Sequence, residues 1–460
     1  MNSPLARTPS ASRTTSSHYD DELAEKAAWL ESGAVVHSGA VVPGLTPQQR
    51  DQEERTACVL FMLVGIGYLF PFSALTQPVD YWKMLFPDFN VEFAITSTFM
   101  YTNLAFLGLI VVAFGKPWYT GRIVGGFIGQ LVVLMFVPTS YFFLSTERAN
   151  TIAVIGGTAA VSIATAFIDS CTIALVSQFP LRVQESFQLG VGLSTLIGSF
   201  YRDLTKLVFP ADELVASTLI YFYTGAVTIA VCIYAYFRLM RLRITKHYVK
   251  DSEPSRTATA TAGIELTETS SLVRHENPGT LQPHQQPTPP VSKWGVLRKV
   301  LHLELLISLV FVTSLSLWPP LVTEIKSFNL PSLEQSGWWS LLLLTVFSIA
   351  DCVGRFTVSH RWILTPSNIW IAVVARFLLI PILVGIVKGV VFTHDLWSVL
   401  FVFVLGHTNG YVGTLAIIFV NESVSPEEQP VAGPFTSFFL NLGLVLGASA
   451  GLLMQRVVLG

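Results

Sequence analysis

Long apolar segments constrain the fold of this 460-residue chain more than any other feature. A membrane-spanning helix needs about 20 consecutive, mostly apolar residues, because the hydrocarbon core of a bilayer is about 30 Å thick. Eleven such windows lie at 57–79, 93–114, 121–144, 151–177, 187–209, 214–240, 301–323, 336–360, 366–390, 395–420 and 431–457. Charged residues make up only 13% of the chain, against roughly 25% in soluble domains. The sequence therefore predicts an all-α polytopic membrane protein with eleven transmembrane helices.

Two polar segments divide these windows into a group of six and a group of five. Residues 1–55 and 241–297 are predicted to form a disordered cytoplasmic tail and a disordered cytoplasmic loop, because their polar composition cannot bury a core. Residues 56–240 would then form an N-terminal six-helix bundle. Residues 298–460 would form a C-terminal five-helix bundle.

Basic residues at the edges of the central loop predict the orientation in the membrane. Those that flank it are Arg238, Arg241, Arg243, Lys246, Arg298 and Lys299. Cytoplasmic loops carry an excess of Lys and Arg. We therefore expect a cytoplasmic N-terminus and an extracellular C-terminus.

Two opposite charges within the eighth window give the clearest functional signal. Asp351 and Arg355 lie four residues apart in DCVGR, so on a helix they share one face and can pair. Charges at this depth cost about 2.5–3.5 kcal/mol on insertion scales and usually mark a substrate or ion path. The pair either locks two helices together or offers hydrogen bonds to a neutral polar solute; we favour the solute. For a carrier of solutes we further expect a location in the plasma membrane.

Asp169 is a second carboxylate inside an apolar window, in TAFIDSCTIAL, with no basic neighbour in sequence. Two interpretations remain open. Asp169 either donates or relays a proton during transport, or it is a static partner of Arg202 or Arg355. Arg202 itself stands in the fifth window beside Asp203 and Lys206, and we expect its side chain to extend to the outer membrane face.

Several classes of function are disfavoured by the residues present. The chain contains no HExxH, no GxSxG and no phosphate-binding loop, and its histidines lack metal-ligand spacing. We therefore expect no enzyme activity, no metal site and no cofactor. The net charge of −2 argues against a nucleic-acid partner, and the four cysteines show no CxxC spacing.

Glycines and aromatic residues in the first and last windows complete the candidate set. Gly443 and Gly447 belong to a GxxxG pattern, which is typical of closely packed membrane helices. Phe72 follows Pro71 in the first window, and its ring can stack on a planar ligand or pack in the core.

Five motifs, in order, resemble the equilibrative nucleoside transporter family. They are GIGYLFPFSALTQPVDYW, WPPLVTEIKS, DCVGR, GHTNGYVGTLAIIF and AGPFTSFFLNLGLVLGAS. The resemblance covers residues 57–457 and implies a major-facilitator-like 6+5 arrangement. It also implies movement of nucleosides across the membrane by alternating access, with the nucleoside and the lipid bilayer as partners.

The resemblance also implies roles for individual residues. Asp351 and Arg355 would hold the ribose hydroxyls, and Phe72 would lie beside the nucleobase. The wall of the pocket would include Leu69, Leu444 and Tyr101; Thr76 and Trp318 would belong to an extracellular gate; and Asn409 and Gly410 would belong to a structural signature.

Two departures from the family pattern leave the substrate open. Phe72 stands where the family commonly has Trp, and Asp169 stands where it typically has a base-reading Gln. An ionised Asp only accepts hydrogen bonds, whereas Gln also donates them. Transport is therefore either facilitative or coupled to protons, and the alternative substrates are nucleobases, organic cations or monoamines bound by Asp169, although Val191 lacks the acid of the monoamine branch. A non-transporting receptor or scaffold is the third alternative.

Overall fold

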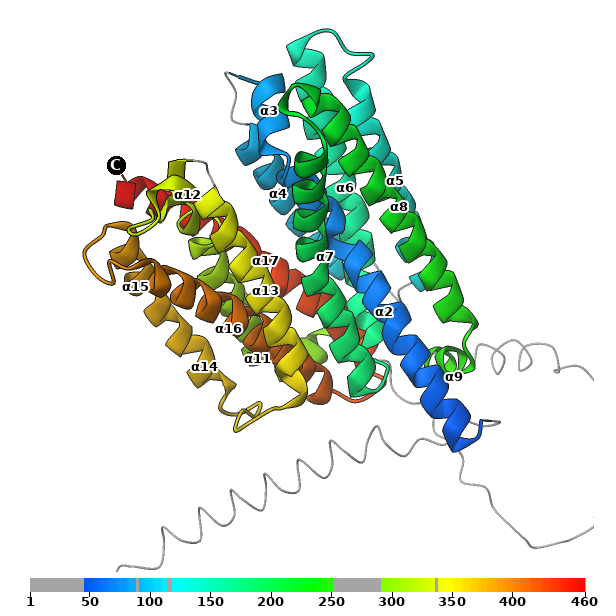
Figure 1. Ribbon diagram of the computed structural model, residues 1–460. Coiled ribbons are helices and arrows are strands. Elements are labelled where there is room, and N and C mark those ends of the chain that lie inside the picture. Colours follow the sequence, from blue (N-terminus) through cyan, green and yellow to red (C-terminus); the bar gives the residue numbers. More distant parts are fainter. Residues whose placement is uncertain (1–44, 88–90, 114–117, 252–290, 336–337, 460) are drawn as a thin grey trace, which may run out of the picture. The chain divides into compact units, whose positions relative to one another are not determined.

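The computed structural model describes residues 45–87, 91–113, 118–251, 291–335 and 338–459, and every regular element in these ranges is a helix (Figure 1). Contacts divide the chain into two compact units, Met1–Pro47 and Gln48–Gly460. The second unit contains nearly all the described residues. Most of the predicted tail and the central part of the predicted loop lie outside the described residues.

The chain forms two successive sets of helices, which Figure 1 colours from blue to green and from yellow-green to red. The first set is α2 (Pro47–Thr76), α3 (Val79–Leu85), α4 (Val91–Ala113), α5 (Tyr119–Ser140), α6 (Glu147–Val176), α7 (Leu181–Val208), η1 (Ala211–Glu213), α8 (Leu214–Arg241) and α9 (Arg243–Asp251). The second set is α11 (Lys293–Leu317), η2 (Val322–Glu324), α12 (Pro331–Gln335), α13 (Trp338–Phe356), η3 (Thr357–Ser359), α14 (Ile369–Ala375), η4 (Arg376–Leu378), α15 (Leu379–Val387), α16 (Asp395–Glu422) and α17 (Gln429–Leu459). We call them the N-half and the C-half.

The helix boundaries differ from the sequence prediction at the polar segments. Helix α2 begins at Pro47, inside the predicted tail, and α9 occupies Arg243–Asp251, inside the predicted loop. Helix α11 begins at Lys293, where the Ser292 hydroxyl accepts a hydrogen bond from the Gly295 N–H and caps the first turn. Apolar windows find the lipid-embedded part of a helix but not its polar extensions, which explains these differences.

Ten helices in the described part of the chain are long and apolar enough to cross a membrane. Helix α7 is not among them, although its 28 residues give it sufficient length. Its charged and polar residues, which made the fifth window the weakest in the sequence, are the reason. The prediction of an all-α polytopic membrane protein is confirmed, and an eleventh crossing by α7 remains compatible with this fold.

A helix break divides the ninth apolar segment. Helices α14 and α15 are joined by the 3-10 turn η4, and Pro381 lies one turn further along the chain. A proline has no N–H, and its ring clashes with the carbonyl four residues earlier, here that of Phe377. The proline therefore accounts for the tightened turn, from which the Arg376 side chain extends.

Glycines bring neighbouring helices of the C-half into close contact. A Cβ atom added to Gly443 would lie 2.4 Å from the Ser308 carbonyl oxygen, and one on Gly447 would lie 2.8 Å from the Phe311 carbonyl oxygen. Both contacts are between α17 and α11. On α16, a Cβ atom at Gly410 would lie 2.0 Å from the Asp351 carbonyl oxygen. These three glycines therefore serve close helix packing, which aligns α11, α13, α16 and α17 around the candidate site.

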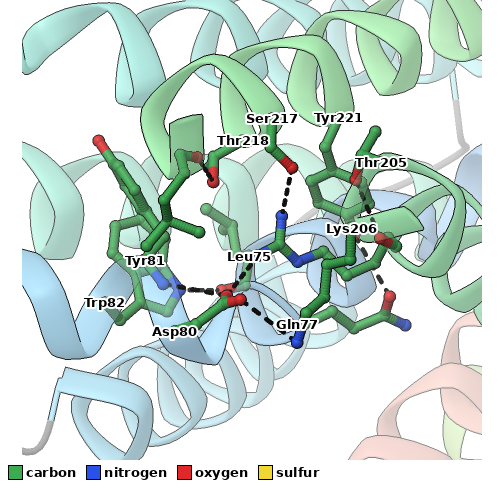
Figure 2. Close-up of polar contacts among 12 residues, drawn as sticks. Leu75, Gln77, Asp80, Tyr81, Trp82, Thr205, Lys206, Ser217, Thr218 and Tyr221 are labelled. Carbon is green, nitrogen blue, oxygen red and sulfur yellow. Dashed lines mark hydrogen bonds and ion pairs between the residues drawn. The ribbon is translucent and has the colours of Figure 1, made fainter. Parts of the chain in front are cut away.

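At the end of α2, a charged cluster attaches the short helix α3 to α7 and α8 (Figure 2). Asp80 forms an ion pair with Arg202, lies 3.4 Å from the Lys206 ammonium group and accepts a hydrogen bond from the Tyr81 N–H. Arg202 is only 5% exposed and also donates to the Ser217 hydroxyl. The prediction that Arg202 extends to the membrane face is therefore wrong: Asp80, which follows the first apolar window, draws it inward.

Neutralising Asp80 should destabilise this cluster. Burial raises the pKa of Asp80, but Arg202, Lys206 and the Tyr81 N–H outweigh it and hold that pKa below its ordinary value. We expect Asp80→Asn to lower the free energy of unfolding by roughly 1–3 kcal/mol at pH 7, because Arg202 loses its carboxylate. The value should lie toward the lower end, since a third of the Asp80 side chain is exposed to solvent.

The pH dependence of unfolding provides the measurement. A lowered pKa stabilises the fold above the ordinary aspartate value of about 3.9, and this contribution is lost as the pH falls through the lowered pKa. Thermal unfolding in detergent should therefore separate wild type from Asp80→Asn at pH 7, and the two curves should converge in acid. Asp212→Asn, at an exposed position in η1, is the matched control and should unfold like wild type at both pH values.

Candidate functional site

Asp351 and Arg355 form a buried ion pair on α13. The distance from Arg355 Nε to Asp351 Oδ2 is 2.8 Å, and the two residues are 8% and 7% exposed. They lie on one helix face, as their four-residue spacing predicts. An ion pair removed from water stays stable only if its remaining donors and acceptors are also satisfied.

Helix α7 of the N-half provides hydrogen-bond acceptors for remaining donors of Arg355. Arg355 Nη1 donates to Gln188 Oε1 at 3.0 Å and to the Gln188 carbonyl oxygen at 3.3 Å. A Cβ atom at Gly192, one turn further, would lie 2.7 Å from Arg355 Cδ, so glycine leaves the space that the arginine fills. The ion pair therefore lies where α13 meets α7, at the contact between the two halves.

Helix α16 holds the other oxygen of the carboxylate. Asn409 Nδ2 donates to Asp351 Oδ1 at 2.7 Å, and Asn409 Oδ1 accepts from the Ser314 hydroxyl of α11 at 2.7 Å. Thr414 lies 3.5 Å from Arg355 Nη1. The neighbouring Gly410, whose missing side chain allows α16 to approach α13, explains how Asn409 reaches the carboxylate.

Asp169 belongs to a second polar cluster, between α6 and α17. Its side chain is fully buried, and its Oδ2 atom accepts a hydrogen bond of 2.7 Å from Asn441 Nδ2. Asn441 Oδ1 in turn accepts from Asn103 Nδ2 of α4, and the Ser437 hydroxyl donates to the Asp169 carbonyl oxygen. Asp169 thus contacts the C-half through neutral groups.

This arrangement bears on one of the two interpretations of Asp169, the static ion pair with an arginine. Among the described residues, Asp169 forms no ion pair with Arg202 or Arg355, so the static-partner alternative is not what the structure contains. Tyr68 of α2 is buried, with its ring centroid 6.3 Å from that of Phe187 on α7, and it interacts with both Asp169 and Arg355. Tyr68 is therefore a candidate site residue that the sequence analysis did not select.

The predicted aromatic and wall residues occupy more varied positions. The ring centroids of Phe72 and Phe99 lie 4.6 Å apart. Phe72, Leu69 and Leu444 are half-buried. Tyr101 is 55% exposed, and its hydroxyl lies 3.0 Å from that of Ser449 on α17. A place for these residues beside a ligand remains a prediction.

The two predicted gate residues lie at helix ends. Thr76 is near the end of α2, and its hydroxyl donates to the Phe72 carbonyl oxygen of its own helix. Trp318 follows α11 and stacks on Phe347 of α13, with ring centroids 4.6 Å apart and planes 13° from parallel. Both residues remain candidates for a gate.

Two further charged residues in apolar helices escaped the sequence analysis. Glu304 of α11 is fully buried and accepts from the Thr436 hydroxyl, and Arg376 of η4 is 3% exposed and donates to Val310 and Ser314. Each is the isolated charge in an apolar stretch, so the signal that selected Asp169 was available for both. Gln188 and Asn441 gave no comparable signal, because neutral amides are common in helices.

Comparison with known proteins identifies the family to which this architecture belongs. A family model described as nucleoside transporter matches residues 155–456, about two thirds of the chain. The chain belongs to the nucleoside transporter family. The matched range contains both polar clusters apart from Tyr68 and Asn103, whereas Phe72, Leu69, Thr76 and Tyr101 precede it.

Individual relatives match over most of their length. Equilibrative nucleotide transporter 8 of Arabidopsis thaliana is 25% identical over 404 residues, covering 86% of this chain and 94% of the relative. Equilibrative nucleoside transporter 4 of Homo sapiens is 24% identical over 496 residues, covering 97% of this chain and 92% of the relative. These relatives are transporters, and the predicted resemblance to equilibrative nucleoside transporters is confirmed.

A solved structure supports the fold. The proton:xylose symporter XylE, a major facilitator superfamily protein, aligns with a TM-score of 0.59 at 9% identity, covering 88% of this chain and 90% of XylE. At this identity the likeness concerns the fold alone, and it confirms the predicted major-facilitator-like arrangement. This member of the nucleoside transporter family is a multi-pass membrane protein that transports nucleosides.

Proposed function

We propose that Asp351 and Arg355 bind the sugar of the transported nucleoside. The observation that supports this proposal is a buried carboxylate and guanidinium at the contact between the two halves. A carboxylate accepts hydrogen bonds and a guanidinium donates them, so the pair matches adjacent ribose hydroxyls, which do both. Because the two residues are less than a tenth exposed, entry of a solute requires the halves to separate locally.

Alternating access would provide that separation, and the polar contacts between the halves support it. Gln184 lies near the start of α7, and Asn421 lies near the end of α16. Asn421 Nδ2 donates a hydrogen bond to Gln184 Oε1 at 3.0 Å. On the same side, the Lys293 ammonium group donates to the Val111 carbonyl oxygen. At the opposite helix ends, the Asp80 cluster stays within the N-half. For the halves to separate, the contact between the Tyr101 and Ser449 hydroxyls of α4 and α17 would have to break, and so would the two contacts on the side of Gln184 and Lys293.

The same side of the molecule carries the basic residues that predict orientation. Arg238, Arg241, Arg243 and Lys246 are exposed around the junction of α8 and α9, as is Arg298 near the start of α11. By the positive-inside rule, we propose that this side and the N-terminus face the cytoplasm of a plasma-membrane protein. With α7 as an eleventh crossing, the C-terminus would be extracellular.

The nucleobase would lie toward Asp169 and Phe72. A carboxylate attracts an amino group of a base, and the Phe72 ring can stack on it, with Leu69, Leu444 and Tyr101 nearby and Thr76 and Trp318 as gate. Asp169 would either remain a fixed acceptor or exchange a proton during the cycle. Nucleobases, organic cations and monoamines are the alternative substrates that an acidic residue here would favour. We propose transport without an accompanying catalytic step.

Removing the guanidinium tests the sugar site. We expect Arg355→Ala to reduce uptake of radiolabelled uridine at least about tenfold, because each hydrogen bond to a charged group contributes about 1.5–3 kcal/mol and 1.4 kcal/mol corresponds to a factor of ten. Surface biotinylation would establish that the variant reaches the membrane.

Arg148→Ala is the control for this test. Arg148 is exposed in the first turn of α6, outside the proposed site and outside the contacts between the halves, so uptake by this variant should stay within about twofold of wild type. Normal uridine uptake by Arg355→Ala would refute the assignment of the sugar site.

The substrate class depends on Asp169, and an isosteric change isolates its charge. Uptake of adenosine, uridine, hypoxanthine and a monoamine would be compared for wild type and Asp169→Asn at pH 5.5 and 7.5. We expect a changed substrate ranking or a changed pH dependence, because an amide cannot ionise. Asp212→Asn serves as control, and identical profiles for Asp169→Asn and wild type would remove the special role of Asp169.

A further inference from the structure

Arg376 is a buried cation without a carboxylate of its own. It is 3% exposed, and no ion pair of the described residues includes it. Its Nη1 atom donates to the Val310 carbonyl oxygen at 3.1 Å, and its Nη2 atom donates to the Ser314 hydroxyl at 2.5 Å. A guanidinium in such a place is costly unless a negative charge compensates it.

Hydrogen bonds lead from Arg376 to Asp351. The Ser314 hydroxyl accepts a hydrogen bond from the guanidinium group and lies 2.7 Å from Asn409 Oδ1. Asn409 Nδ2 lies 2.7 Å from Asp351 Oδ1. The four residues come from η4, α11, α16 and α13. We call Arg376–Ser314–Asn409–Asp351 the donor chain.

The donor and acceptor capacities of the groups allow only one direction for each hydrogen bond in the donor chain. An ionised carboxylate only accepts, so the Asn409 amide must turn its NH₂ group to Asp351 and its oxygen to Ser314. The Ser314 hydroxyl has one proton. If it were donated to the Val310 carbonyl oxygen, 3.1 Å away, two oxygens would face each other at 2.7 Å without a proton between them. All donors therefore point from the cation toward the anion.

We infer that Arg376 is a positioning residue for the sugar site, acting on Asp351 through Ser314 and Asn409. The inference rests on the proposed sugar-binding role of Asp351 and Arg355. Asp351 shares one oxygen with Arg355 and the other with Asn409. When Arg355 turns to a substrate hydroxyl, the donor chain keeps the carboxylate in place and supplies the compensating positive charge.

Alignment of the donors strengthens the chain. Hydrogen bonds that follow one another in one direction polarise each other, and the low dielectric of the interior strengthens each of them. The 3-10 turn η4, which precedes Pro381, carries Arg376, so the ninth apolar segment contributes to the site without a side chain of its own touching the proposed ligand.

Variants that remove or restore the Ser314 hydroxyl distinguish the positioning role from a purely structural one. Ser314→Ala breaks the donor chain but leaves the Arg376 bond to Val310. Ser316→Ala is the matched control: Ser316 is equally buried on α11, and its hydroxyl donates to the Thr313 carbonyl oxygen of its own helix. Ser314→Thr restores a hydroxyl, and Ser314→Cys provides a second variant of similar volume if the alanine variant does not reach the surface.

The experiment measures KM and Vmax for uptake of uridine and of 2′,3′-dideoxyuridine, which lacks the hydroxyls that Asp351 would recognise. We expect Ser314→Ala to lower the preference for uridine about tenfold, mainly through a higher KM for uridine. Uptake of the dideoxy analogue should change little, and Ser314→Thr should recover the preference.

Three outcomes would contradict the inference, and they can be told apart. If wild type does not prefer uridine, the sugar site itself is refuted, and the donor chain with it. If wild type prefers uridine and Ser314→Ala matches Ser316→Ala, the role of the donor chain alone is refuted. Equal loss of both substrates in Ser314→Ala would show that the bond serves only packing of α11 against η4.

Discussion

The burial of opposite charges between α13 and α7 is the constraint on which the rest of the site depends. An ion pair in a medium of low dielectric is costly unless every remaining donor and acceptor is satisfied. Gln188, Asn409 and Thr414 provide that satisfaction for Asp351 and Arg355, and the missing side chains of Gly192 and Gly410 provide the space. The hydrogen bonds that stabilise the ion pair therefore depend on the close approach of the helices at these glycines.

Among the described residues, the polar contacts between the two halves join charged or neutral groups to neutral amides, hydroxyls and carbonyl groups, and no ion pair connects the halves. Asp169 contacts the C-half through Asn441, and Arg355 contacts the N-half through Gln188. Such hydrogen bonds, between charged and neutral partners, hold a conformation without the large penalty of separating two buried charges. This is a suitable contact for a protein whose halves must separate and rejoin in every transport cycle.

The sequence predicted those contacts of the site that join residues close together in the chain. The four-residue spacing of Asp351 and Arg355 implies a shared face, and the structure has their ion pair. The sequence-based prediction failed for Arg202, because the carboxylate that pairs with it, that of Asp80, is 122 residues away in the chain. Arg376 and Glu304 could have been selected by the isolated charge that each carries, whereas their partners could not, since a hydrogen bond between helices depends on how those helices pack.

The sequence by itself determined that this chain spans a membrane as α-helices, because in lipid every backbone polar group must be satisfied within the segment. It also determined the family, and it predicted a division into a group of six helices and a group of five. Only the tertiary structure decided which polar groups meet: that Gln188 reaches Arg355, that Asn441 reaches Asp169, and that Arg376 connects to Asp351. The physical reason is that periodicity fixes which face of a helix a residue occupies, while the neighbour on that face is set by packing between segments distant in sequence.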